Sequence, residues 1–227
     1  DFGVREVHFE DDNFTLKREP VVAFCEAMLK KNRGMTFALP NGVRLDTLDP
    51  ELLRLMERAG FYSMSVGVET GSPRLLKLMM RHLDLRQMEE QIRLVKRSSS
   101  IRVTAFLIMG YPSETLAEME ATIRYAMSLP VDRIHISNFL ALPGTPIFAQ
   151  LLAEGAIDLD TIDWESYLDN RLSYSPDGIS HARLRWMMKK GFFRFYFRPK
   201  ILRGLFGEIH NASQLGIVVR RAVDTFL

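Results

Sequence analysis

Five strand-like runs alternate with helical patterns, and this alternation constrains the fold more than any other feature of the sequence. The runs occupy residues 4–9, 35–40, 61–68, 102–110 and 133–142. Strands that alternate with helices of about 10 to 15 residues form βα units, whose strands lie parallel in one sheet. The sequence therefore predicts an α/β fold with a parallel sheet, built from five βα units before residue 156.

Capping signals mark where the intervening helices begin and end. Asp49 is expected to cap a helix whose first residue is Pro50, and Gly60 is expected to end it. Ser113 is the expected cap of the helix that follows the fourth run. The same start signal recurs at Ser72-Pro73 and Thr145-Pro146, and the same stop signal at Gly34 and Gly155.

Composition excludes several classes of protein. The net charge is only +2, so the chain as a whole is not drawn to nucleic acid. A single cysteine, Cys25, excludes an internal disulfide. No apolar run is long enough to span a bilayer and no signal peptide is visible, which together with the cysteine predicts a cytoplasmic protein. The chain begins at Asp1 rather than Met, and we expect it to be a fragment of a longer protein.

Charged, amide or glycine residues follow every strand-like run. The first run is followed by Asp11, Asp12 and Asn13 within FEDDNFT. The later runs are followed by PNGVR (40–44), GVETGS (67–72), GYPSE (110–114) and LPGT (142–145). The carboxyl ends of parallel strands meet at one edge, where such folds carry their chemistry. We therefore expect one ligand site there, with Arg44 and Arg81 offsetting the acids; ordinary polar loops are the alternative.

Taken together, these segments resemble the radical S-adenosylmethionine (SAM) superfamily. The resemblance covers about residues 1–152 and is strongest for the cobalamin-binding branch, which includes anaerobic magnesium-protoporphyrin ester cyclases and hopanoid methylases. It implies a partial (β/α) parallel barrel of radical SAM type, with residues 1–155 supplying the family's strands two to six. Residues 156–227 would then form an acidic connector and a basic, aromatic helical extension.

The resemblance also implies the chemistry. Members hold a [4Fe–4S] cluster with three cysteines of a CxxxCxxC loop and cleave SAM reductively to a 5′-deoxyadenosyl radical that acts on an unactivated carbon. The full-length protein is expected to use cobalamin, a small-molecule substrate and an electron donor such as flavodoxin or ferredoxin. Here Cys25 lies within a helical pattern and is expected to be a buried apolar side chain. The cluster cysteines are therefore expected upstream of Asp1, and the fragment alone is expected to be inactive.

The resemblance also implies which residues of this sequence bind the cofactor, one position at a time. Asp11, Asp12 and Asn13, which stand where much of the superfamily has Gly-Gly-Glu, correspond to the motif that receives the SAM ammonium. Glu69 resembles the acid that binds the ribose or the amino group, and Arg81 the base that pairs with the SAM carboxylate. The adenine is expected against Gly110, Tyr111 and Pro112 and against the backbone of Leu140 to Leu142; Asn41 and Arg44 complete the expected cofactor-binding set.

Two other functions fit the same pattern. A methylthiotransferase-type radical SAM enzyme is one, although that branch normally adds a small β-barrel domain at the C-terminus. The other is a non-catalytic barrel that serves as a binding module. An upstream CxxxCxxC motif would favour the enzyme over the binding module.

The segment from Ser180 to Gly204 is basic and aromatic. Ser180 is expected to cap a helix that Pro199 kinks or ends, with Leu184, Met187, Met188 and Phe192 forming an apolar stripe. Three interpretations remain open: a helix packed across the barrel, a site for a membrane surface or a hydrophobic substrate, and RNA binding. Nucleic acid is the least supported, because no RNA-binding motif is present.

Overall fold

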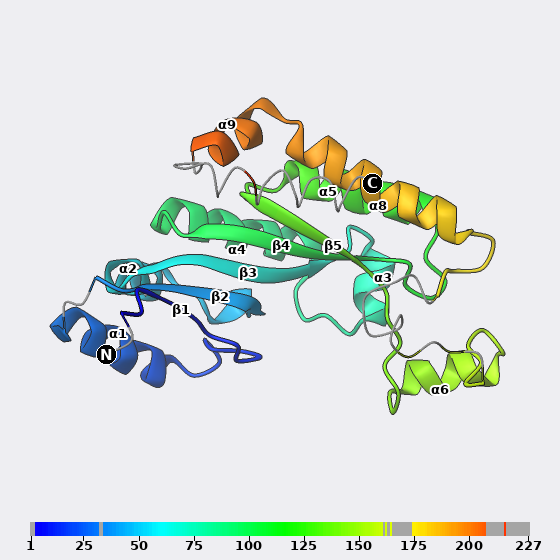
Figure 1. Cartoon of the computed structure of the whole chain (residues 1–227), viewed down its shortest axis with the longest axis horizontal. Helices are drawn as coiled ribbons and strands as arrows, with labels where there is room; N and C mark the ends of the chain where they lie inside the picture. The colour runs from blue at the N-terminus through cyan, green and yellow to red at the C-terminus, as the bar shows by residue number, and fades with distance from the viewer. Residues whose placement is uncertain are drawn as a thin grey trace.

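The computed structural model describes residues 3–31, 34–160, 162, 164, 174–207 and 216. Its five strands form one parallel sheet in the order β1-β2-β3-β4-β5, the order of the sequence (Figure 1). Each strand therefore pairs with the strand that follows it along the chain, as in an open half-barrel. The strands are β1 (Glu6–His8), β2 (Thr36–Val43), β3 (Phe61–Glu69), β4 (Arg102–Met109) and β5 (Arg133–Asn138). All five predicted strands are confirmed.

Helices connect the strands and extend beyond them. They are α1 (Arg18–Lys31), the 3-10 turn η1 (Leu45–Thr47), α2 (Pro50–Ala59), α3 (Pro73–Leu78), α4 (Leu85–Ser98), α5 (Leu116–Ser128), α6 (Pro146–Ala153), α8 (His181–Tyr196) and α9 (Pro199–Gly207). Most predicted caps are confirmed. The Asp49 carboxylate accepts the backbone N–H groups of Glu51 and Leu52, both at 2.9 Å. Ser72, Thr145 and Ser180 cap their helices in the same way.

The predicted cap at Ser113 is wrong. Helix α5 begins at Leu116, and Thr115 is its N-cap. The Thr115 hydroxyl accepts the Glu118 N–H at 3.3 Å, while the Glu118 carboxylate accepts the Thr115 N–H at 3.0 Å. This capping box satisfies two donors that Ser113 would leave without a side-chain acceptor. Ser113 instead adopts a left-handed conformation with φ 65°.

Strand β2 is longer than predicted. The expected loop at residues 40–44 lies mostly inside the strand, because a bulge absorbs Asn41 and Gly42. Leu39 pairs with Met64 and Val43 with Val66, so the extra residues of β2 have no partners in β3. Gly42 has φ 107°, which glycine adopts without steric cost. Of the predicted loop, only Arg44 follows the strand.

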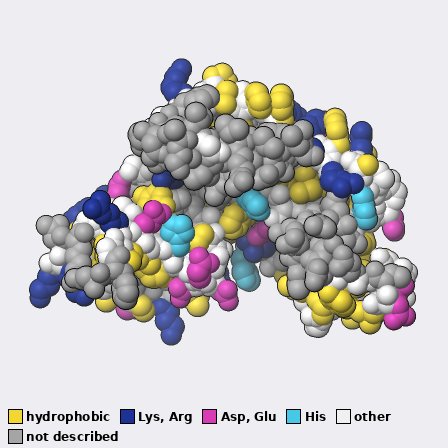
Figure 2. Space-filling view, viewed as in Figure 1, with side chains coloured by type: hydrophobic (Ala, Val, Ile, Leu, Met, Phe, Trp, Pro, Cys, Tyr) yellow, Lys and Arg dark blue, Asp and Glu magenta, His cyan; other side chains and the backbone are white. Residues whose placement is uncertain are grey.

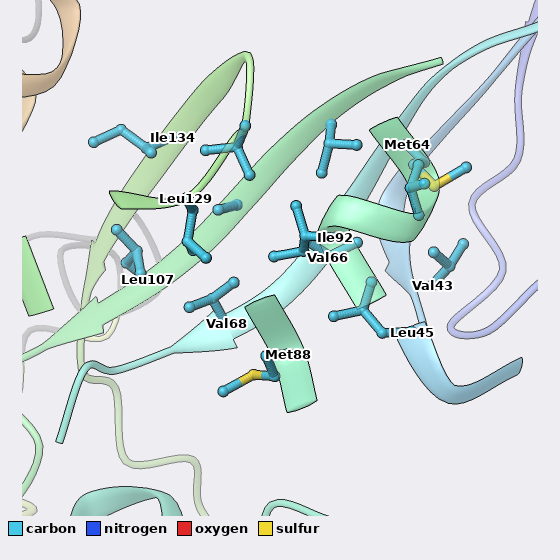
Figure 3. Packing of buried hydrophobic residues seen from close by; sticks show 14 of the residues in the cluster. Val43, Leu45, Met64, Val66, Val68, Met88, Ile92, Leu107, Leu129 and Ile134 are labelled. Carbon is cyan, nitrogen blue, oxygen red and sulfur yellow. The ribbon is translucent and has the colours of Figure 1, made fainter. Parts of the chain in front are cut away.

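The main core lies between the sheet and its helices. Along β4 the residues Val103, Ala105, Leu107 and Met109 are buried, and the residues between them are only partly buried. Val66 and Val68 of β3 pack in the same cluster as Met88 and Ile92 of α4 and Ile134 of β5 (Figure 3). This alternation is what a sheet with helices on one face requires. Cys25 is fully buried in the same core, as expected, and burial raises the pKa of its thiol to about 11.

Helix α8 extends the layer of helices and packs on α5 and β5 (Figure 1). Leu184, Met187 and Phe195 are buried in the main core. Gly191 permits the close approach, because a Cβ there would lie 2.7 Å from Cδ1 of Ile136. The predicted packing of this helix against the barrel is confirmed, and it ends before Pro199, which starts α9. In the predicted stripe, Met188 and Phe192 are only partly buried.

Most of the predicted acidic connector lies outside the described residues. The part of the chain that the structure describes contains no helix long and apolar enough to cross a membrane.

Candidate functional site

Glu69 and Arg81 form an ion pair at the carboxyl edge of the sheet. Nη2 of Arg81 lies 3.2 Å from Oε1 of Glu69 and donates a hydrogen bond of 2.9 Å to the carbonyl oxygen of Gly67. The Glu69 side chain is 16% exposed; burial raises its pKa, and the Arg81 charge opposes this rise. Glu69 also has φ 64°, a strained conformation for a residue with a Cβ. The fold thus holds one carboxylate against one guanidinium where β3 ends.

Gly67 makes room for this pair. A Cβ at position 67 would lie 2.5 Å from Oε1 of Glu69 and 2.7 Å from Nη2 of Arg81. Any larger residue would therefore push the two charged groups from their positions. In the sequence Gly67 was notable only as a glycine at a strand end, although it stands two residues before Glu69, a spacing that places both residues on the same side of a strand.

A cleft of about 320 Å³ opens beside the pair. Gly67 and Arg81 line one part of it, and Arg44 and Asp46 line another. Arg44 binds Asp46 through two hydrogen bonds of 3.0 and 2.5 Å, which lower the pKa of the Asp46 carboxyl. The walls also include Val43, Leu45, Met79, Met80, His82, Leu83 and Met88. The cleft therefore offers two guanidinium groups and the Asp46 carboxylate beside apolar surface, a combination that suits a ligand with anionic, cationic and apolar parts.

The acids of the first loop are not part of the ion pairs that Arg44 and Arg81 form. Asp11 and Asp12 are exposed, and Asn13 is partly buried. Of the two arginines expected to offset the acids at the strand ends, Arg81 pairs with Glu69, whereas Arg44 pairs with Asp46. On the face shown in Figure 2, acidic, basic and histidine side chains gather around a hollow between the two lower lobes of the molecule.

Contacts between neighbouring loops fix the first loop in place. Asn41 donates a hydrogen bond of 2.7 Å to the carbonyl oxygen of Glu10. Thr15 is buried, and its hydroxyl lies 2.9 Å from that of Thr47 in η1. Asn41 was expected to bind the cofactor. In the structure its side-chain amide instead holds the loop after β1 against β2.

The turn after β4 is built around the buried carboxyl group of Glu114, a residue that was not among the predicted site residues. Glu114 is 2% exposed, and its Oε2 accepts the backbone N–H groups of Gly110 at 2.6 Å and Tyr111 at 3.2 Å. Burial raises the pKa of Glu114 to about 7, although these two hydrogen bonds oppose the rise. Gly110, with φ 86°, packs against Leu184 of α8. The spacing of Glu114 four residues after Gly110 was visible in GYPSE.

The residues expected near an adenine form a second group. Tyr111 packs edge-on against Phe139 with 5.1 Å between ring centroids, and Leu140 packs in the same small cluster. Pro112 is partly buried, and Leu142 is 50% exposed. The Leu142 carbonyl oxygen already accepts the Thr145 hydroxyl at 2.6 Å. The backbone contact predicted for Leu142 would therefore compete with the cap of α6.

Arg74 joins α3 to α5 and to the turn after β4. Its guanidinium donates to the Glu118 carboxylate at 2.7 and 2.9 Å and to the Ser113 carbonyl oxygen at 2.8 Å. Hydrogen bonds from Arg74 are the largest cause of the low pKa of Glu118, about 2. Close packing adds to this link, because a Cβ on Gly71 would lie 2.6 Å from the carbonyl oxygen of Ala121 in α5. Neither Arg74 nor Glu118 was predicted as a site residue, since each binds the other rather than a ligand.

The cofactors implied by the resemblance fit this chain unequally. Glu69, Arg81 and the space beside Gly67 suit the ammonium, hydroxyl and carboxylate groups of SAM. A [4Fe–4S] cluster does not fit, because the sequence has one cysteine and Cys25 is buried in the core. Among the described residues, no three His, Cys, Asp or Glu side chains are placed to hold a metal ion.

Comparisons with known proteins identify a family and several relatives. Residues 1–126 match the family model described as the radical SAM superfamily. An uncharacterized methyltransferase of Pyrococcus horikoshii is 25% identical over 227 residues, which cover 100% of the chain and 47% of the relative. The hopanoid C-2 methylase of Rhodopseudomonas palustris is 29% identical over 216 residues, 92% of the chain and 39% of the relative. The chain thus spans less than half the length of these curated relatives.

A magnesium-protoporphyrin cyclase and a solved structure extend the comparison. The anaerobic magnesium-protoporphyrin IX monomethyl ester cyclase of Rubrivivax gelatinosus is 23% identical over 193 residues, 85% of the chain and 34% of the relative. Among solved structures, the radical SAM methyltransferase TsrM of Kitasatospora setae, with cobalamin and a [4Fe-4S] cluster bound, aligns with a TM-score of 0.59 at 17% identity. That alignment covers 80% of the chain and 37% of TsrM, and it confirms the partial-barrel fold.

Proposed function

Because the chain belongs to the radical SAM superfamily, we propose that it binds SAM at the carboxyl edge of its half-barrel, as part of an enzyme that acts on an unactivated carbon. The observation that carries this proposal is the Glu69–Arg81 pair, held together at 3.2 Å over a glycine. A structural ion pair would not need a strained backbone, whereas strain at a strand end is common where a site positions a ligand.

The chain's own residues bind and orient the ligand. Arg81 offers its guanidinium to the carboxylate of SAM, and Glu69 accepts hydrogen bonds from its ammonium or ribose hydroxyls. The turn from Gly110 to Pro112, with Leu140, supplies apolar surface beside the adenine. When bound and reduced by one electron from a [4Fe–4S] cluster, SAM would release methionine and supply a 5′-deoxyadenosyl radical. The chain's residues do not supply three thiolates, so we assign them no part in electron transfer.

We further propose that the reaction is a methyl transfer that depends on cobalamin. Support comes from the methyltransferase that matches the whole chain, from the hopanoid C-2 methylase, and from the likeness to cobalamin-bound TsrM. The substrate is a small molecule, and the electron donor is a flavodoxin or ferredoxin. The similarity to the magnesium-protoporphyrin cyclase supports a second candidate reaction, ring closure by the same radical chemistry.

Product analysis tests the reaction class. The natural polypeptide that carries this chain, loaded anaerobically with iron, sulfide and cobalamin, is incubated with SAM and a reductant. We expect 5′-deoxyadenosine, together with S-adenosylhomocysteine if a methyl group is transferred. A polypeptide that contains a spectroscopically verified cluster but forms neither product would contradict the proposal. Formation of 5′-deoxyadenosine alone would favour the cyclase-like outcome.

A further inference from the structure

The outward face of α8 carries three large aromatic side chains that are exposed to solvent. Trp186, Phe193 and Phe197 are 46%, 52% and 56% exposed. Spacings of seven and four residues place the three on one side of the helix, opposite the side that packs on α5 and β5. Figure 2 shows hydrophobic side chains along the upper edge of the molecule, over α8 and α9, with lysine and arginine beside them.

The helix itself carries only positive charge around these rings. Between Asp177 and Glu208 the sequence has eight lysine or arginine residues and no acid. Glu120 of α5 faces this helix and pairs with Lys190 and, at 3.5 Å, with Arg194. Exposed Arg183 and Arg194 lie on one flank of the aromatic residues, and exposed Arg185 lies on the other. At 1.5 Å per residue, the aromatic residues span about 16 Å of the helix. The result is an apolar strip with arginine on both flanks.

The rings are already engaged through their faces. The Arg183 guanidinium lies 4.7 Å and the Lys190 ammonium 4.9 Å from the centroid of the Trp186 ring. Phe193 and Phe197 stack on each other at 4.1 Å with an interplanar angle of 22°. Nucleic-acid bases bind aromatic side chains through their faces, so this arrangement disfavours RNA. The headgroup region of a bilayer requires only apolar bulk flanked by cations, and tryptophan and phenylalanine are common there.

We propose that this surface binds an anionic lipid bilayer, with α8 lying parallel to the membrane. We call it the α8 aromatic face and define it as Trp186, Phe193 and Phe197 with Arg183, Arg185 and Arg194. The aromatic rings enter the headgroup region while the arginines contact lipid phosphates. The helix stays packed on α5 and β5, so binding is peripheral and needs no rearrangement of the barrel.

Vesicle flotation tests the proposal on the intact chain. We expect binding to vesicles that contain phosphatidylglycerol and little binding to pure phosphatidylcholine. Raising the salt to about 0.5 M should weaken binding at least tenfold, because each arginine near a charged surface contributes to affinity. In a Trp164→Phe variant, Trp186 is the only tryptophan of the sequence. Its emission should shift to shorter wavelength on vesicles and be quenched by brominated lipid.

Matched variants distinguish binding through this face from nonspecific adsorption of exposed apolar side chains to vesicles. The variant Trp186→Ser/Phe193→Ser/Phe197→Ser should bind anionic vesicles at least about tenfold more weakly. A control changes to serine three residues of comparable exposure elsewhere: Val4, Leu16 and Leu159, at 56%, 57% and 47%. That control should bind like the wild type. Far-UV circular dichroism checks that each variant is folded. If the aromatic variant unfolds, the variant Arg183→Glu/Arg185→Glu takes its place and should likewise bind anionic vesicles more weakly.

Several outcomes would overturn the proposal. Equal binding to both kinds of vesicle would show that charge plays no part, and unchanged binding of a folded face variant would show that this face is not used. Saturable binding of single-stranded RNA without vesicle binding would identify RNA as the occupant. Self-association that the aromatic substitutions abolish, again without vesicle binding, would identify a second copy of the chain. None of these outcomes bears on SAM binding.

Discussion

At the scale of single residues, Gly67 gives the most local test of the site. A Cβ at this position would meet the ends of two flexible side chains, Glu69 and Arg81, rather than backbone. We therefore expect Gly67→Ala to cost less than about 1 kcal/mol of folding stability while weakening SAM binding about tenfold or more. Thermal melts and binding titrations on the cofactor-loaded natural polypeptide measure both. Unchanged affinity in the variant would show that the pair does not need this space.

Glu114 makes a second prediction at this scale, because its folded pKa is raised from the ordinary 4.5 to about 7. The folded chain then holds a proton that the unfolded chain releases, so this group's contribution to stability falls as the pH rises from about 4.5 to about 7. The loss is at most roughly 3 kcal/mol. Glu114→Gln keeps an oxygen to accept the Gly110 and Tyr111 N–H groups and should remove this decline.

Urea unfolding of both proteins across this pH range measures the effect. Glu118 does not confound it, because the low pKa of Glu118, about 2, places its loss of stability below pH 4.5, as the pH falls. If wild type and Glu114→Gln decline in parallel between pH 4.5 and 7, the carboxyl is not the group that titrates.

At the scale of elements, Gly71 sets the distance between the loop after β3 and α5. Its Cβ would meet backbone, the carbonyl oxygen of Ala121 at 2.6 Å, so one element must move. We expect Gly71→Ala to lower the free energy of unfolding by about 1–3 kcal/mol. The matched control is Gly204→Ala in α9, where nothing lies within 4 Å of the added Cβ; it should stabilise the helix by up to about 1 kcal/mol. Chemical denaturation of the two variants measures both changes in the free energy of unfolding. Equal changes for Gly71→Ala and Gly204→Ala would contradict the idea that close packing on α5 requires glycine at position 71.

The same scale shows why most elements could be predicted and two details could not. Asp49, Ser72 and Thr145 were readable because each precedes a proline at the first helical position. The prediction of Ser113 as the cap of α5 was wrong because Thr115 and Glu118 form a capping box two residues later. The predicted end of β2 was wrong because a bulge lets the strand continue through an Asn-Gly pair that normally signals a turn.

At the scale of the whole molecule, topology decides which predicted site residues meet. Five parallel strands in chain order bring their carboxyl ends to one edge, so the Glu69–Arg81 pair and the shared cleft of Arg44 and Arg81 were within reach of sequence reasoning. The role of Arg74 was not, because its partner Glu118 lies 44 residues further along the chain and becomes adjacent only when the elements pack in three dimensions. Gly67 and Glu114 lie within four residues of Glu69 and Gly110, so their roles could have been predicted from local spacing.

The most direct test of the account is a SAM binding titration. The natural polypeptide that carries this chain, with its cluster loaded anaerobically, is compared with Glu69→Gln, Arg81→Met and Arg86→Met. Arg86 is the matched control, because it forms an exposed ion pair with Glu90 at 3.0 Å within α4. We predict that the first two variants lose at least about tenfold in affinity, since each removes a charged partner of SAM, and that Arg86→Met binds like the wild type. Wild-type affinity in both Glu69→Gln and Arg81→Met would contradict the account.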